Sequence, residues 1–212
     1  MRSLETRSPD AGATRLPLAV AGLCGVLLGA YAVELAIAWR DGPAELETFL
    51  HAWGLVPREF LAGRVLTPLT AMFLHAGVVH LASNVAFLAF FGRDLEPLLG
   101  ARGVLLLFFA CGLGAAAVHV ATAPDSFVTT LGASGAVSGM LGAWWRMRGR
   151  RETAEGPRGG LGGFALLVLW LLAQLASGVS SGGGVAAWAH LAGFAIGFGL
   201  APRVFAVTTR TD

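Results

Sequence analysis

Long apolar runs separated by short polar stretches dominate the chain from residue 16 onward. A bilayer hydrocarbon core of ~30 Å requires about 20 mainly apolar residues in helical conformation. Six runs approach this length: Leu16–Trp39, Leu74–Phe91, Val104–Ala123, Leu131–Trp145, Leu161–Ser177 and Val185–Phe205. The pattern therefore predicts an all-α, polytopic membrane protein.

The composition supports a lipid environment. Of the 212 residues, 55% are hydrophobic and 13% are charged, whereas soluble domains carry about 25% charged residues. A soluble core of this size cannot hide so much apolar surface. The basic residues cluster next to apolar spans and form no basic-aromatic patch that suggests a nucleic-acid partner. We expect one membrane domain at residues 16–206, with short cytoplasmic tails at 1–15 and 207–212.

The arginines indicate the orientation of the spans, because cytoplasmic loops are enriched in basic residues. With the N-terminus in the cytoplasm, only Arg40, Arg58 and Arg64 lie outside. The inside segments then hold Arg2, Arg7, Arg15, Arg93, Arg102, Arg146, Arg148, Arg150, Arg151, Arg158, Arg203 and Arg210. This distribution predicts a multi-pass protein of the cell (inner) membrane with both termini in the cytoplasm.

One loop on the outer side is long, from Arg40 to about Thr70. It mixes acidic residues with apolar ones such as Phe49 and Trp53. Short amphipathic helices lying at the membrane interface would produce this pattern. An ordinary folded loop outside the membrane explains it equally well.

Polar side chains inside apolar spans are costly and require an explanation. In the second span, His80 and Asn84 are four residues apart and therefore share one helix face. Both side chains can donate hydrogen bonds, so the pair can stabilise a negatively charged oxygen. The alternative is a polar clamp between helices. His75 lies about 140° away around the predicted helix axis, at ~100° per residue, and is expected to have a different role.

Ser134 stands at the start of the fourth span, where free N–H groups and the helix dipole favour negative charge. Gly135, Ser138, Gly139 and Gly142 form a stripe of small residues beside it. Such a stripe lets another helix approach closely. Taken alone, the pattern is compatible with a nucleophile or with a helix cap at a packing face.

The sixth span carries His190, Gly193 and Gly197 at positions i, i+3 and i+7. These positions share one helix face, so the face suited to close packing also holds the imidazole. A histidine titrates in the range that suits a general base. A structural histidine is the alternative.

The predicted topology brings these side chains to one depth. The second, fourth and sixth spans all enter the membrane from outside, and His80, Asn84, Ser134 and His190 lie in their first turns. A nucleophile, a base and two hydrogen-bond donors at one level form a site for acyl transfer.

These residues resemble the motifs of the rhomboid intramembrane serine proteases, over roughly Arg64 to Leu200. The matching elements are Phe73-Leu74-His75 with His80 and Asn84, Gly132-Ala133-Ser134-Gly135, and Ala189-His190-Leu191-Ala192-Gly193. The order and spacing of the motifs and the number of helices agree with that family.

The resemblance implies a rhomboid-like bundle of six transmembrane helices with a cavity open to the outer, periplasmic side. Ser134 would be the nucleophile and His190 the general base, without an acidic third member. The oxyanion hole would comprise His80, Asn84 and the backbone N–H of Ser134. Substrates would be single-span membrane proteins cleaved near the outer face. The catalytic unit would be monomeric and would use no cofactor or metal.

Structural and packing roles are expected for a further set of residues: His75, Gly132, Gly135, Gly139, Gly193 and Gly197. Close packing through the glycines would orient the imidazole in place of an acidic residue. Three features depart from the family pattern. The spacing from Arg64 to His75 is longer than in many bacterial members, and the other two departures concern residue types. Gly63-Arg64 stands where many bacterial members have Trp-Arg, and Ser138 stands where an aromatic residue often packs on the catalytic histidine.

Two other functions remain open. The first is an inactive rhomboid-like protein that binds client transmembrane helices, although such proteins typically lack the serine or the histidine. The second is a small channel or transporter. A transporter would show charged residues in the middle of its spans or repeated, broken helices. Glu34, near the outer end of the first span, is the only acidic residue within a predicted span.

Overall fold

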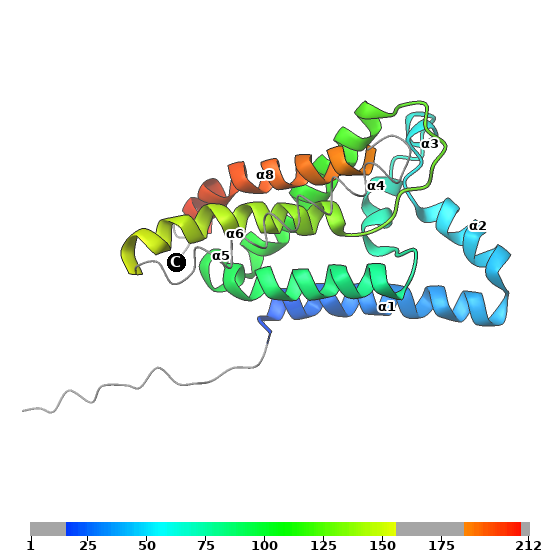
Figure 1. Cartoon of the computed structure of the whole chain (residues 1–212). Coiled ribbons are helices and arrows are strands. Elements are labelled where there is room, and N and C mark those ends of the chain that lie inside the picture. The colour runs from blue at the N-terminus through cyan, green and yellow to red at the C-terminus, as the bar shows by residue number, and fades with distance from the viewer. Residues whose placement is uncertain (1–15, 156–184, 209–212) are drawn as a thin grey trace, which may run out of the picture.

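The computed structural model describes residues 16–155 and 185–208 of the chain. The fifth predicted span, Leu161–Ser177, lies outside these residues. Regular structure in the described part is helical, with a single isolated β-bridge between Leu55 and Thr130. The all-α prediction is confirmed for this part of the chain, and Figure 1 shows its main helices gathered into a bundle.

Helix α1 covers Leu18–Arg40, close to the first predicted span. Its first N–H groups have no capping side chain at Pro17, the residue before the helix. The buried carboxylate of Glu96, from a distant part of the chain, takes that role. It accepts hydrogen bonds from the N–H groups of Ala19 at 3.0 Å and Val20 at 2.9 Å. A carboxylate at a helix N-terminus also interacts favourably with the helix dipole.

Helix α5 runs from Val78 to Thr122 and contains a sharp kink at Gly100, where φ is 68° and ψ is 168°. A straight helix of 45 residues would be about 68 Å long at 1.5 Å per residue, roughly twice the thickness of a bilayer core. Figure 1 shows the chain turning back at this kink, so that α5 forms two arms, 78–99 and 101–122.

The two arms of α5 correspond to the second and third predicted spans, with one correction. The helix begins at Val78 and its first arm ends near residue 99, so the predicted bounds Leu74–Phe91 are wrong at both ends. His75 therefore lies in the turn before the helix and not on one of its faces. The apolar run continues across this turn, so it carried no signal for the helix start.

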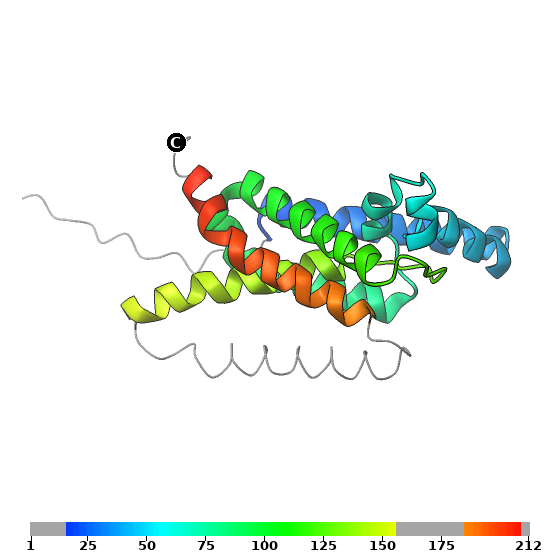
Figure 2. The same cartoon turned by 90° about the horizontal axis from the view of Figure 1, so that it is seen from above.

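Helix α6 covers Ser134–Glu155 and helix α8 covers Val185–Thr208. The predicted fourth span began at Leu131, three residues too early, and ended at Trp145, ten residues too early. Residues 136–144 of α6 are all buried, which makes this helix the centre of the bundle. Figures 1 and 2 show α6 and α8 lying side by side.

Glycines determine how closely α6 and α8 approach. A Cβ atom placed on Gly193 would collide with the carbonyl oxygen of Gly135, and one on Gly197 would collide with that of Gly139. The two backbones are thus in direct contact at two successive levels. This is the arrangement that small-residue stripes permit between membrane helices.

The outer segment contains α2 (Pro43–Trp53), α3 (Pro57–Leu61), α4 (Thr67–Thr70) and the 3₁₀ turn η1 (Ala71–Phe73). The predicted short helices are therefore present in this segment, whereas their place at the membrane interface stays a prediction. Figure 2 shows them at one end of the bundle. Large apolar side chains such as Val65, Leu66 and Leu61 are exposed there, as a membrane interface would favour.

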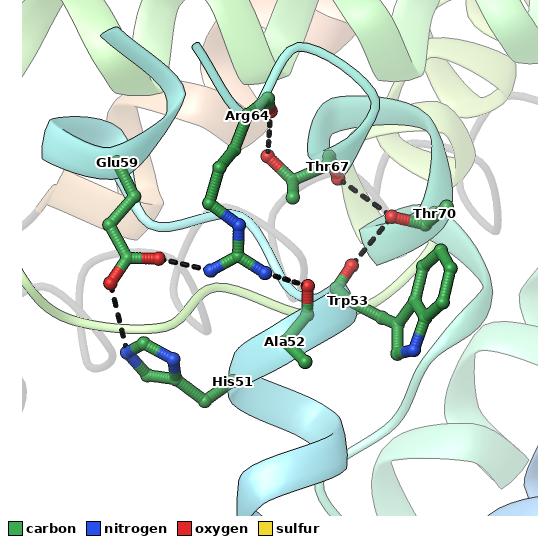
Figure 3. Close-up of polar contacts among 7 residues, drawn as sticks. All are labelled: His51, Ala52, Trp53, Glu59, Arg64, Thr67 and Thr70. Atoms are coloured by element: carbon green, nitrogen blue, oxygen red, sulfur yellow. Dashed lines mark hydrogen bonds and ion pairs between the residues drawn. The ribbon is translucent and has the colours of Figure 1, made fainter. Parts of the chain in front are cut away.

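Arg64 connects the parts of this outer segment, as Figure 3 shows. Its guanidinium forms an ion pair with Glu59 and donates a hydrogen bond to the carbonyl oxygen of Ala52. Glu59 also lies 3.5 Å from Nε2 of His51. An arginine can bridge two acceptors in this way because its donors form a rigid fork.

Two helices in the described part are long and apolar enough to cross a membrane, α1 with a mean hydropathy of 2.0 and α5 with 2.3. A shorter apolar stretch covers Ala187–Ala201 of α8. Because α5 is kinked into two arms, it has the length for two crossings. The helices form a membrane-type bundle around α6.

Candidate active site

Ser134 and His190 form the centre of the candidate site. Ser134 is the first residue of α6 and His190 lies near the start of α8. The Oγ atom of Ser134 and the Nε2 atom of His190 are 2.7 Å apart, a hydrogen bond between residues 56 positions apart in the chain. The contact expected between these two side chains is present. Through it, the imidazole can remove the hydroxyl proton as the oxygen attacks an acyl carbon.

The local glycines explain why the two side chains meet. Gly135 follows Ser134 directly, and Gly193 lies one turn after His190. Because the α8 backbone touches the carbonyl of Gly135 at Gly193, the starts of the two helices are held together. A larger residue at Gly193 would separate the helices at the level of the hydrogen bond.

His80 and Asn84 lie in the first turns of α5, opposite Gly132. A Cβ atom on Gly132 would lie 2.7 Å from Nε2 and Cε1 of His80 and 3.8 Å from Nδ2 of Asn84. Gly132 has φ +112°, a region that residues with a side chain rarely adopt. The position therefore favours glycine for two reasons, the close approach of His80 and the positive φ. Because Gly132 has no side chain, the polar groups of His80 and Asn84 lie directly against the segment before Ser134.

Asn84 is buried, whereas His80 is only partly buried. Asn84 is 3% exposed. Its Nδ2 atom donates a hydrogen bond to the carbonyl oxygen of His80 at 2.9 Å. An amide nitrogen carries two hydrogens, so this bond leaves one donor position. His80 borders the cavity described next, whereas Asn84 does not.

A cavity of about 220 Å³ adjoins the dyad. Most of its wall is apolar and comes from α5, α6, α8 and the outer segment. Its polar side chains belong to His80, His119, Thr130, Ser134 and His190. An apolar pocket with a few convergent polar groups is the usual form of a small binding site.

His75 lies behind His80 and is 1% exposed. Its backbone N–H donates to Oε1 of Glu34 in α1 at 3.1 Å. The imidazole rings of His75 and His80 are 5.1 Å apart in an edge-on arrangement. Neither ring nitrogen of His75 has a hydrogen-bond partner in the described structure. The structure thus places His75 between α1 and the candidate oxyanion donor.

Ser138 is buried one turn after Ser134. A serine there cannot cover the imidazole face as an aromatic residue would, whereas α8, which carries His190, is in close contact with α6. The glycines of the two helices provide that contact, as described above.

His119 and Thr130 were not among the residues predicted from the sequence to belong to the site. The His119 side chain is buried near the end of α5, and its Nε2 atom lies 2.7 Å from Oγ1 of Thr130. A signal was available for His119, since it is an imidazole within an apolar span, like His80 and His190. Thr130 has no comparable signal, because threonines are ordinary in loops.

Comparisons with known proteins agree on one family. The Rhomboid domain matches residues 62–207 of the chain. The chain is 29% identical over 147 residues to RHOMBOID-like protein 7 of Arabidopsis thaliana, which covers 69% of this chain and 44% of that protein. It is 31% identical over 137 residues to RHOMBOID-like protein 4 of the same plant, covering 61% and 32%.

A shorter match of higher identity covers 72 residues of Rhomboid-like protein 11, chloroplastic, also of Arabidopsis thaliana. The identity is 42%, over 34% of this chain and 25% of that protein. The chain spans less than half the length of each of these relatives. The domain match includes the candidate site, whereas α1 lies before it.

Proposed function

Because this chain belongs to the rhomboid family, we propose that it is a serine endopeptidase that hydrolyses peptide bonds in the transmembrane segments of other membrane proteins. The observation that carries the proposal is the 2.7 Å hydrogen bond between Ser134 and His190. A serine hydroxyl is a weak nucleophile until a neighbouring base accepts its proton. The two residues supply this pair from one chain, so we expect a monomeric catalytic unit.

The reaction would proceed in two acyl transfers. The Oγ of Ser134 attacks the carbonyl carbon of the scissile bond while Nε2 of His190 takes the hydroxyl proton. The tetrahedral intermediate collapses, the C–N bond breaks, and His190 gives its proton to the leaving amine. A water molecule then attacks the acyl-enzyme, again losing a proton to His190, and the returning proton restores Ser134.

The negative oxygen of the tetrahedral intermediate would be stabilised by three donors. Ser134 is the first residue of α6, so its N–H is not used within the helix. The imidazole of His80 and the amide of Asn84 lie against Gly132, two residues before the nucleophile. Donors arranged before the reaction stabilise the developing charge without reorganisation, and one such donor is worth about 10²–10³-fold in rate.

No acidic third residue is part of the proposal. In a triad this residue orients the imidazole. Here the backbone contacts of Gly193 and Gly197 with α6 would fix the position of α8 and so the direction of the imidazole. The chemistry requires no metal or cofactor.

The segment before Ser134 offers an edge for the substrate backbone. Thr130 pairs with Leu55 through both its N–H and its C=O. In an extended segment, the backbone groups of the neighbouring residues, Thr129 and Leu131, point to the other side. A substrate in extended form can add to that side by backbone hydrogen bonds. A transmembrane helix must unwind to do so, which favours substrates with small or helix-breaking residues.

We further propose six transmembrane helices in the cell membrane, both termini in the cytoplasm, and an active site that opens to the outer side. The arginine distribution supports this orientation. The starts of α5, α6 and α8 then face outward, so the cavity lies near the outer surface. Single-span membrane proteins would be the substrates, presented from the surrounding lipid.

An inactive rhomboid-like protein that binds client helices is the second candidate. The presence of both Ser134 and His190, already hydrogen bonded, favours the protease. Purified protein in detergent or liposomes would be incubated with a model single-span substrate, beside Ser134→Ala and His190→Ala. If the chain is a protease, the unmodified protein cleaves the substrate and both variants fail to cleave it. Cleavage that survives Ser134→Ala, or binding of the substrate without cleavage by the unmodified protein, would rule out the assignment.

A further inference from the structure

Thr130 is attached to two distant parts of the chain. It lies in the non-helical segment between α5 and α6, four residues before Ser134. Its N–H donates to the carbonyl oxygen of Leu55 at 2.8 Å, and its own carbonyl accepts from the N–H of Leu55 at 3.0 Å. Its side-chain hydroxyl is hydrogen bonded to Nε2 of His119 at 2.7 Å.

The same segment is fastened to the outer segment on both sides of Thr130. Before it, the carbonyl of Ser126 accepts a hydrogen bond from the N–H of Arg58 at 3.2 Å. After it, the N–H of Gly132 donates to the carbonyl of Ala71 at 2.8 Å. Backbone hydrogen bonds to the outer segment therefore hold the chain before Ser134 at three places, residues 126, 130 and 132.

Among these three residues, Thr130 is held by its side chain as well as by its backbone. Helix α6 begins at Ser134, and its first hydrogen bond reaches back to Ala133, whose carbonyl oxygen accepts from the N–H of Val137 at 2.9 Å, but not to Thr130. Gly132 has no side chain and a permissive backbone. Thr130 combines a backbone pairing with the outer segment and a side-chain hydrogen bond to His119 of helix α5.

We infer that Thr130 is a positioning residue for Ser134, anchored by His119 of α5 and by Leu55 of the outer segment. The inference rests on the proposed function. Catalytic groups must be held within ~0.5 Å of their productive geometry. A shift of the segment at Thr130 would move the N–H and the Oγ of Ser134 relative to His190 and the oxyanion donors.

The cavity adds a second reason for the inference. His119 and Thr130 both border it, beside Ser134 and His190. Ala115, one turn before His119 on the same face of α5, touches Gly135 directly after the nucleophile. One face of α5 therefore contacts the chain on both sides of the nucleophile, through His119 at Thr130 and through Ala115 at Gly135.

The test compares Thr130→Val with Thr130→Ser. Valine keeps the shape but loses the hydroxyl, whereas serine keeps the hydroxyl. Thr122→Val is the matched control, because the hydroxyl of Thr122 is exposed and bonds only to its own helix. For each protein we would measure kcat and KM on a model single-span substrate, the rate at which a fluorophosphonate labels Ser134, and the temperature of unfolding.

We expect Thr130→Val to lower kcat and the labelling rate by about 10-fold or more, since misplacement by ~1 Å can cost about 100-fold. KM should change less than kcat. For Thr130→Ser, kcat and the labelling rate should stay within about 3-fold of the values for the unmodified protein. Thr122→Val should have the same kcat and labelling rate as the unmodified protein. Equal activity of Thr130→Val and the unmodified protein would overturn the inference, as would an equal loss in Thr130→Ser.

A second variant covers the case in which Thr130→Val does not fold. His119→Leu removes the same hydrogen bond from the other side and should slow labelling to a similar degree. Where both single variants fold, their combination should be slower by clearly less than the product of the two separate losses, because both variants remove the hydrogen bond between Thr130 and His119. Additive losses would contradict a shared role.

The same experiment separates failure of the proposed function from failure of this inference. If the unmodified protein neither cleaves the substrate nor reacts with the fluorophosphonate, the proposed function fails. If it does both and Thr130→Val has the same rates, only this inference fails.

Discussion

Oε1 of Glu34 accepts a hydrogen bond from the backbone N–H of His75 at 3.1 Å. The carboxylate belongs to α1 and has 2% exposure, so it is buried where a charged group is costly. The bond holds the turn before α5, whose histidine ring lies against His80. Glu34 precedes the matched family domain, yet it supports the wall of the candidate site.

Replacing Glu34 should therefore affect stability. Glu34→Leu leaves the N–H of His75 without an acceptor, and a buried unpaired donor costs about 1–3 kcal/mol. Glu34→Gln keeps a side-chain oxygen and should lose less. Reversible unfolding in mixed micelles would measure the free energy of unfolding of both variants. A Glu34→Leu protein as stable as the unmodified one would contradict this role.

Glu96 provides a second prediction, at the other end of α1. It accepts hydrogen bonds from the N–H groups of Ala19 and Val20. Glu96→Ala should destabilise the protein by about 1–2 kcal/mol, the upper range for loss of a helix cap. The same unfolding measurement applies, with Glu47→Ala in the exposed helix α2 as the control. An equal effect of the two substitutions would show that the cap does not stabilise α1.

The contact between α6 and α8 gives a third prediction. A side chain at Gly197 would collide with the carbonyl of Gly139, whereas a Cβ at Gly199 would meet nothing within 4 Å. Gly197→Leu should lower proteolytic activity by about 100-fold through displacement of His190, while membrane insertion stays normal. Gly199→Ala should remain active. Full activity of Gly197→Leu, measured on the same substrate, would exclude helix packing as the device that orients the imidazole.

Much of the candidate site could be predicted because polar side chains within apolar spans cost free energy and therefore stand out in the sequence. Ser134, His190, His80 and Asn84 stood out as polar groups within apolar runs, and the glycine spacing of α8 indicated the packing face. The arginines indicated an orientation of the spans independently of these residues, and that orientation stays a prediction. The hydrogen bond between Ser134 and His190, which a nucleophile and its general base would form, is present.

The rest depends on contacts that have no local signal. The helix start at Val78 lies inside an apolar run, so His75 was wrongly placed on the helix. The cap formed by Glu96 joins residues 76 and 77 positions apart. The bridge between Leu55 and Thr130 depends on backbone groups that every residue carries. Such pairings are determined by the packing of the whole bundle.

The central claim is that His190 activates Ser134. Fluorophosphonate labelling of the purified protein, read out by mass spectrometry of its peptides, tests it most directly. We predict that the label is found on Ser134 and that His190→Ala slows labelling by at least about 100-fold, the scale of general-base catalysis. Label on another serine, or equal labelling rates with and without His190, would contradict the account.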